Sequence, residues 1–146
     1  MNRLTLLLIT LVIVLNGCNL TPESTYEIKG EQSKIIAEMI DAVNEKDAEK
    51  YVIGFADHVQ VFVESDMKIN GREALKANRA NHFKGHPKVR SEIQHLVEID
   101  NRVILHDKVW LEESDKTGQD IVEIFTFEDG KVSRVDVIQP KDLFKR

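Results

Sequence analysis

Two groups of ionisable side chains in the second half of this 146-residue chain have the composition of acid–base sites. The first is His95 with Asp107, because a carboxylate orients an imidazole and raises its basicity, which makes a general base. The second is Glu123 with Arg134 and Asp136, in which one guanidinium fork suits two carboxylates and the surplus negative charge favours a retained proton. Each group could act on a bound molecule, and each could instead be a structural ion pair or a satisfied polar pair.

The second group depends on the register of the last predicted hairpin, whose Asp-Gly dipeptide at 129–130 is a strong two-residue turn signal. An uninterrupted register pairs Phe125 with Arg134. It also pairs Glu123 with Asp136, so that all four side chains share one face of the sheet with other apolar residues. The opposite face is apolar too, so the face that carries the charged group could be the exposed one.

The first group depends on an earlier hairpin, with predicted strands at about 88–99 and 103–113. A two-residue turn would mix apolar and polar side chains on both faces, whereas a three-residue loop at 100–102 aligns the apolar ones. Because a slip of one residue moves a whole apolar set to the other face, the three-residue loop is favoured. It places His95 opposite Asp107 on that apolar face. No serine or cysteine nucleophile is assigned beside the pair, so water would have to react, or a proton would be taken from carbon.

The elements that would position these groups follow from the periodicity of the apolar residues. Residues 35–43 repeat at helical spacing, and Ser33 is the expected N-cap of that helix. The elements that come next are a short helix capped by Asp47, a strand at 59–64, a loop at 66–71 and a helix at 72–83.

The N-terminus resembles a bacterial lipoprotein signal peptide. Arg3 precedes an apolar run at 4–15, and the tetrapeptide at 15–18 ends in Cys18 after a glycine, which is the charge–apolar–small order of a secretory signal. The run is shorter than the roughly 20 residues of a membrane-spanning helix. The resemblance implies that residues 1–18 are a signal peptide ending in a lipidated Cys18, which carries diacylglycerol and acyl chains such as palmitate. An ordinary cleaved signal peptide and an uncleaved anchor helix are the alternatives.

We expect a domain at 33–146, joined by a polar tether at 19–32 to a membrane of the bacterial cell envelope and facing outside the cytoplasm. Cys18 is the only cysteine, so no disulfide can form within the chain. The formal charge is −5 with acids and bases interspersed, and without a basic face nucleic acid is excluded as a partner. His82 and His86 lie four residues apart but lack a third ligand, so we expect no metal site, and nothing indicates an organic cofactor.

The order of the elements and four short segments resemble the SnoaL-like branch of the nuclear-transport-factor-2-like superfamily. The segments are 42–47, 55–59, 70–75 and the final hairpin at 125–132. The resemblance implies an α+β domain in which a cone-like, bent, mixed β-sheet wraps around about three N-terminal helices and forms an apolar pocket. The residues expected at that pocket are Met39, Val63, Trp110, Glu123, Phe125, Arg134 and Asp136.

The superfamily includes isomerases, cyclases, hydrolases, dehydratases and binding modules, so the fold alone does not assign a function. The three catalytic positions of ketosteroid isomerases fall on Met39, Val63 and Glu123, of which only Glu123 is an acid. We therefore expect a domain that binds a small apolar molecule in its pocket rather than an enzyme. Two alternatives stay open. One is an interaction or homodimerisation domain that uses the sheet face. The other is an acid–base enzyme of isomerase, dehydratase or hydrolase type that uses His95, Asp107 or Glu123.

Overall fold

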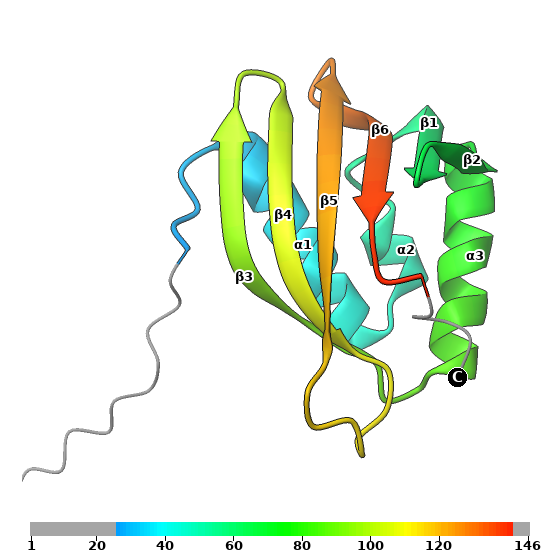
Figure 1. Cartoon of the computed structure of the whole chain (residues 1–146). Helices are drawn as coiled ribbons and strands as arrows, with labels where there is room; N and C mark the ends of the chain where they lie inside the picture. Colours follow the sequence, from blue (N-terminus) through cyan, green and yellow to red (C-terminus); the bar gives the residue numbers. More distant parts are fainter. Residues whose placement is uncertain (1–25, 142–146) are drawn as a thin grey trace, which may run out of the picture.

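A six-stranded sheet curls around three helices in the computed structural model, which describes residues 26–141 (Figure 1). The predicted signal peptide with Cys18, and residues 19–25 of the predicted tether, lie outside the described residues. No helix within 26–141 is long and apolar enough to cross a membrane. In chain order the elements are α1 (Glu31–Glu45), α2 (Ala48–Tyr51), β1 (Phe55–Val63), β2 (Asp66–Asn70), α3 (Arg72–Gly85), β3 (Arg90–Ile99), β4 (Arg102–Trp110), β5 (Gln119–Glu128) and β6 (Lys131–Ile138).

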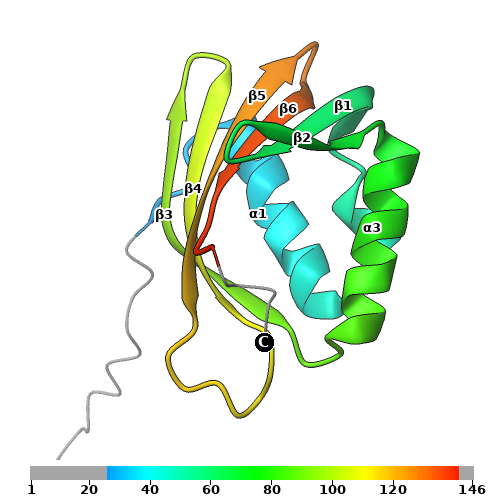
Figure 2. The same cartoon turned by 45° about the vertical axis from the view of Figure 1, so that its right-hand side comes forward.

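The strand order is β2-β1-β6-β5-β4-β3, and the sheet is mixed because β1 pairs with β6 in parallel while the other neighbours are antiparallel. Figure 2 shows α1 and α3 on the same side of the sheet, where α1 packs on β3 and β4 and α3 packs on β1 and β2. This is the α+β, bent, mixed-sheet architecture that the sequence predicts. The expectation of about three N-terminal helices is not confirmed, because α3 follows β2 instead of preceding the sheet.

β2 occupies residues where the sequence predicts a loop. The chain reverses at Glu64 and Ser65, which both adopt left-handed backbone angles, with φ of 50° and 74°. Such a turn usually contains glycine or asparagine, and neither is present here, so the pattern gave no signal for a hairpin. β2 pairs with β1, and its Ile69 lies opposite Val61 on the side of the interior.

The first helix begins at Glu31, two residues before the expected N-cap Ser33. The carboxylate of Glu98 on β3 caps it instead, because Oε2 accepts hydrogen bonds from Ser33 N and Ser33 Oγ, each 2.7 Å long. Gly30 leaves room for this carboxylate, since a Cβ there would lie 2.2 Å from its oxygens. The start of α1 is therefore fixed by a contact with a distant strand and not by a local cap.

The core lies between the inner face of the sheet and the helices. Ile36, Met39 and Ile40 recur at helical spacing on α1 and are buried, as the sequence predicts. Phe125 on β5 and Leu105 on β4 are fully buried opposite them. Each such side chain stabilises the fold by about 1.5–3 kcal/mol relative to an exposed one.

The hairpin between β3 and β4 corrects one predicted register. Its turn has two residues, because Ile99 pairs with Arg102 and Asp100 takes a left-handed φ of 52°. One extra residue in β3 between Ile93 and His95 then shifts the pairing. The predicted three-residue loop is wrong, because a β-bulge within the strand, and not a longer loop, brings the apolar residues of the two strands to one face.

The hairpin between β5 and β6 turns at 129–130, as predicted, but its register shifts further along. An extra residue at Ser133 interrupts β6, so that Phe125 pairs with Val135 and not with Arg134. Because side chains alternate between faces, this single insertion moves Arg134 and the residues that alternate with it to the outer face.

Candidate functional site

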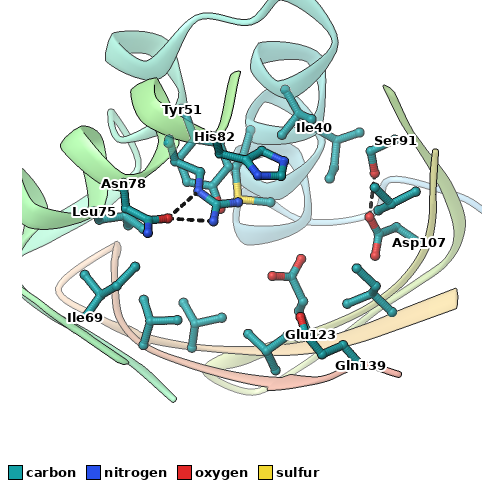
Figure 3. Close-up of a pocket in the computed structure, with 18 of the residues that line it drawn as sticks. Ile40, Tyr51, Ile69, Leu75, Asn78, His82, Ser91, Asp107, Glu123 and Gln139 are labelled. Carbon is teal, nitrogen blue, oxygen red and sulfur yellow. Dashed lines mark hydrogen bonds between the residues drawn. The ribbon is translucent and has the colours of Figure 1, made fainter. Parts of the chain in front are cut away.

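A cavity of about 330 Å³ lies between the inner face of the sheet and the helices (Figure 3). Most of its wall is apolar, because the inward positions of α1 and of several strands carry aliphatic side chains. Polar groups reach it from α2, α3, β2, β3, β4 and β5. The aliphatic residues along the wall include Met39, Ile40, Val61, Val63, Ile69, Leu75, Val109, Ile121, Val135 and Val137.

Two carboxyl groups enter the cavity from adjacent strands, Asp107 from β4 and Glu123 from β5 (Figure 3). Asp107 pairs with Ile121, and Leu105 pairs with Glu123, so the two acids are diagonal neighbours on one face of the sheet. The Cα atoms of diagonal neighbours lie about 7–8 Å apart, which lets both side chains reach one bound group.

Burial shifts both carboxyl groups toward their neutral forms. Burial, and then the charge of Asp107, raises the pKa of Glu123 to about 8, and the Arg79 guanidinium offsets only part of this rise. Burial raises the pKa of Asp107 to about 6, against the hydrogen bond that it accepts from Ser91. At neutral pH the pair therefore holds one proton and one negative charge, as expected of two carboxyl groups in one buried site.

Asp107 is held by a chain of hydrogen bonds that starts on α1. The Asn44 side chain accepts a hydrogen bond from Ser91 N (2.8 Å) and donates one to Ser91 O (2.9 Å). The Ser91 hydroxyl donates to Asp107 Oδ2 at 2.5 Å. The second oxygen, Oδ1, is buried and has no hydrogen-bond partner among the described residues. Because buried polar atoms are nearly always paired, such an atom in a cavity wall points to a ligand group.

One face of α3 lines the cavity, because Leu75, Arg79 and His82 follow one another at spacings of four and three residues. Arg79 and His82 are the polar residues among these three. Arg79 donates two hydrogen bonds to Asn78 Oδ1 (2.8 and 3.2 Å), and its guanidinium carbon lies 5.6 Å from the centroid of the Tyr51 ring. Burial, helped by the charge of Arg79, lowers the pKa of His82 to about 4. His82 is therefore a neutral imidazole at neutral pH.

Tyr51 lines the cavity on the side of α2 (Figure 3). Its ring stacks on Phe55 with the centroids 5.5 Å apart. Burial raises the pKa of its hydroxyl above the ordinary value, and the nearby charges of Glu123 and Asp107 add to the rise. The hydroxyl therefore stays protonated and can donate a hydrogen bond to a bound molecule.

The predicted pocket residues do not all reach the cavity. Met39, Val63 and Glu123 line it, together with Asp107. Phe125 is fully buried in the core.

Trp110 lies at the end of β4 and is buried under Arg90, whose guanidinium carbon is 3.5 Å from the ring centroid. This cation–π contact covers the indole on the outside of the sheet and does not belong to the lining of the cavity.

The predicted pairing of His95 with Asp107 is wrong. The two-residue turn places His95 opposite His106, with their Nδ1 atoms 3.0 Å apart, and His106 Nε2 lies 3.0 Å from Asp120 Oδ1. These imidazoles are on the outer face of the sheet, whereas Asp107 points into the cavity. His95 therefore cannot act as a base on a molecule bound in the cavity.

The predicted cluster of Glu123, Arg134 and Asp136 is also wrong. The bulge at Ser133 turns Arg134 and Asp136 to the outer face, where the guanidinium donates to both carboxylate oxygens at 2.6 and 2.7 Å. The Arg134 guanidinium carbon lies 3.9 Å from the centroid of Phe62. Glu123 stays on the inner face without these partners.

Sequence reasoning missed most polar contributors to the site, among them Tyr51, Arg79, His82 and Ser91. The sequence pattern assigns no site role to Tyr51, Arg79 or Ser91, and it suggests His82 only as an incomplete metal ligand. The helical spacing of Leu75, Arg79 and His82 is the signal that could have identified one face of α3. Among residues 26–141, no group of three or more His, Cys, Asp or Glu side chains is arranged to hold a metal ion.

The sequence of residues 36–135 matches the family model of the SnoaL-like domain. This chain belongs to the SnoaL-like domain family. No curated protein matches it in sequence.

Solved structures share the fold of this SnoaL-like domain. An uncharacterised cystatin-fold protein from Novosphingobium aromaticivorans is 24% identical, with a TM-score of 0.67 over 75% of this chain and 99% of that one. A SnoaL-like protein of unknown function from Burkholderia thailandensis is 18% identical, with a TM-score of 0.65 over 77% and 98%. A protein proposed to be a polyketide cyclase, from Sinorhizobium meliloti, is 18% identical, with a TM-score of 0.60 over 71% and 93%. At these identities the likeness shows the fold alone.

Proposed function

We propose that this SnoaL-like domain binds a small, largely apolar molecule in the cavity between the sheet and its helices. The observation that carries the proposal is the composition of the wall, which is aliphatic on most sides and carries Asp107 and Glu123 on the sheet, with further polar groups from the helices. Ligand sites generally combine apolar walls with a small number of polar groups that orient the ligand. A cavity of about 330 Å³ is at the small end of such sites and suits a molecule of one or two rings.

The test is the uptake of an apolar dye by the full-length protein and its block by a side chain that fills the cavity. Ile69→Trp places an indole in the cavity from β2, whereas Met67→Trp changes an exposed position of the same strand. We expect N-phenyl-1-naphthylamine to fluoresce with the wild type and with Met67→Trp. Ile69→Trp should weaken dye binding at least about tenfold, which corresponds to about 1.4 kcal/mol. Equal uptake by the two variants would contradict the proposal, and native mass spectrometry of the purified protein identifies any ligand that it carries.

A second candidate function is acid–base catalysis in the same cavity. One observation favours it: Asp107 and Glu123, with pKa values of about 6 and about 8, would supply a base and an acid together near neutral pH. For a ligand identified by mass spectrometry, Asp107→Asn and Glu123→Gln should each abolish its conversion while the protein still binds it. Conversion that survives both substitutions would exclude this function.

The outer face of the sheet supports the alternative of self-association. Val97, Ile99 and Ile138 are exposed there, with exposed fractions of 47%, 55% and 60%. Burial of such side chains against a second copy would be favourable. Light scattering at high protein concentration tests this role, because a monomer excludes it and a dimer that Val97→Asp disrupts supports it.

We also propose that Cys18 anchors the domain to a membrane of the bacterial cell envelope, on the side facing away from the cytoplasm. The support is the sequence alone: Arg3, the apolar run at 4–15 and the glycine before the cysteine. Metabolic labelling with palmitate should mark the wild type and not Cys18→Ser. Incorporation of the label in both would exclude lipidation at Cys18.

A further inference from the structure

We infer that the cavity selects a molecule whose polar end presents a hydrogen-bond donor and an acceptor side by side, as in an amide, with Asp107 accepting and Glu123 donating. This inference rests on the proposed ligand-binding function and names the chemical class of the ligand's polar end. It is built from the free oxygen of Asp107, the position of Glu123 and the charges around them.

Asp107 provides the hydrogen-bond acceptor. Asp107 has an exposed fraction of only 3%, and its carboxylate cannot turn away, because Ser91 binds Oδ2 while Asn44 holds the backbone of Ser91. Oδ1 is left without a partner among residues 26–141. An unpaired buried acceptor costs free energy when the cavity is empty or holds a purely apolar ligand. A ligand N–H or O–H that donates to Oδ1 removes this cost.

Glu123 provides the hydrogen-bond donor. Glu123 lies diagonally across from Asp107 on the neighbouring strand, and no hydrogen bond joins the two among the described contacts. Burial keeps Glu123 protonated at neutral pH, and a neutral carboxyl group can donate a hydrogen bond while an ionised one cannot. Asp107 and Glu123 therefore offer one acceptor and one donor at a spacing that leaves room for a ligand group between them.

An amide, a carboxylate and an ammonium group differ in how they fit this position. A primary amide carries an N–H and a C=O that project side by side, so it satisfies both positions at once. A carboxylate has no donor for Asp107 and would place a second negative charge beside it. An ammonium group has no acceptor for Glu123. Of these three groups, the amide is the one whose hydrogen-bonding pattern matches the pair without a change of charge.

The charged and titratable groups that face the pair set the pH range of this preference. They are Tyr51 from α2, Arg79 and His82 from α3, and Lys68 from β2. Tyr51 and His82 are neutral near pH 7, and the positive charge of Arg79 lowers the pKa of Glu123 less than burial raises it. The donor–acceptor state therefore persists between about pH 6 and about pH 8, and the preference for an amide should fall on both sides of this window.

The experiment measures the affinity of the full-length protein for four probes that share one apolar body: naphthalene, 2-naphthamide, 2-naphthoate and 2-naphthylmethylammonium. At pH 7 we expect 2-naphthamide to bind about tenfold or more tightly than the other three. Asp107→Leu and Glu123→Leu should remove this preference. Glu123→Gln keeps a donor that does not ionise, so it should retain the preference and extend it above pH 8. Asp136→Asn, on the outer face, is the matched control and should behave as the wild type.

The outcomes separate this inference from the function on which it rests. If the naphthalene probes bind with equal affinity, or if the preference survives Asp107→Leu and Glu123→Leu, the inference is wrong while the cavity remains a ligand site. If no probe binds the wild type, and Ile69→Trp leaves dye uptake unchanged as well, both the inference and the proposed function are overturned. Circular dichroism of each variant shows whether it is folded, and Glu123→Gln provides the test in a variant that keeps the shape of the side chain.

Discussion

On the inner face of the sheet, Asp107 and Glu123 lie among apolar side chains, whereas on the outer face Arg134 and Asp136 pair with each other with side-chain exposed fractions of 45% and 36%. Asp107 is buried and Glu123 is half-buried in the cavity wall, and burial raises the pKa of both. The outer pair keeps much of its hydration, and exposed ion pairs contribute little to stability. Acidic side chains of similar chemistry thus lie in different surroundings according to the face that they occupy: an apolar cavity wall inside and an exposed ion pair outside.

The two faces also differ in whether their polar groups are paired. The outer face has more contacts between polar side chains, including those of His95 with His106 and of His106 with Asp120. These groups are paired with one another at the surface. The inner face has fewer polar groups, and one of them, Asp107 Oδ1, has no partner among the described residues. A buried acceptor without a partner is a stronger sign of ligand binding than an exposed network whose members are paired.

The largest expected difference between the faces concerns aromatic packing. Phe125→Ala should lower the free energy of unfolding by about 3–5 kcal/mol, because Phe125 is fully buried and its removal leaves a cavity in the core. Phe62→Ala, on the outer face, should cost about 1 kcal/mol, since it loses mainly the contact with the Arg134 guanidinium. Urea denaturation measures both values. Equal losses would show that the two faces are packed alike.

The next effect is a pH dependence of stability that belongs to the inner face. In the folded protein Glu123 keeps its proton up to about pH 8, whereas an ordinary glutamate releases it near pH 4.5. The free energy of unfolding should therefore fall as the pH rises from about 4.5 to about 8, because over that range only the folded state binds this proton. Glu123→Gln should flatten the slope and raise the free energy of unfolding at pH 8.5 by on the order of 2 kcal/mol.

The control for this slope lies on the outer face. Asp136→Asn should change stability by no more than about 0.5 kcal/mol and should leave the slope intact. Denaturation curves at a series of pH values compare the two variants. A flat profile for the wild type would mean that Glu123 is ionised in the fold at neutral pH.

A smaller effect is expected at the end of β3, where the inner face meets α1. Glu98→Gln weakens the cap on Ser33 and should cost about 1 kcal/mol, the usual magnitude of a helix cap. Glu92→Gln, at an exposed position of the same strand, should be neutral within about 0.5 kcal/mol. Thermal denaturation at equal protein concentration distinguishes the two. A neutral Glu98→Gln would mean that the backbone of α1 alone fixes its start.

The smallest effect is expected for His95. His95→Gln changes an exposed side chain whose ring faces His106, so stability should change by no more than about 0.5 kcal/mol. Binding of any ligand in the cavity should be unchanged, because His95 is on the other face of the sheet. A loss of binding would place His95 in contact with the inner site and would contradict the register of β3 and β4.

Much of the fold could be predicted from local patterns in the sequence. The spacing of Ile36, Met39 and Ile40 predicts α1, and the Asp-Gly turn at 129–130 predicts the last hairpin. The candidate site was predicted less well: Met39, Val63, Asp107 and Glu123 line the cavity, but neither predicted cluster forms. Both errors come from treating a bulged strand as regular: for β3 this assumption favours a three-residue loop where the turn has two residues, and for β6 it extends the register past Ser133 without a shift.

The bulge in β3 follows from contacts that a local pattern cannot contain. Ser91 must face inward to meet Asn44 of α1, and Glu98 must face inward to cap α1 at Ser33. These two positions on β3 are seven residues apart, so a regular strand would place them on opposite faces. One extra residue between Ile93 and His95 brings both to the inner face. The same logic applies to β6, where Val132 and Val135 are both buried although three positions separate them.

The sequence by itself determined the helices, most of the strands, the family and the presence of acids with the potential for chemistry. Only the tertiary structure decided which of those acids face the cavity. The physical reason is the period of a strand: with side chains alternating between faces, one inserted residue exchanges the buried and exposed sets. Whether an insertion is tolerated depends on partners from distant parts of the chain, here α1 for β3, and such partners are brought together only by the folded structure.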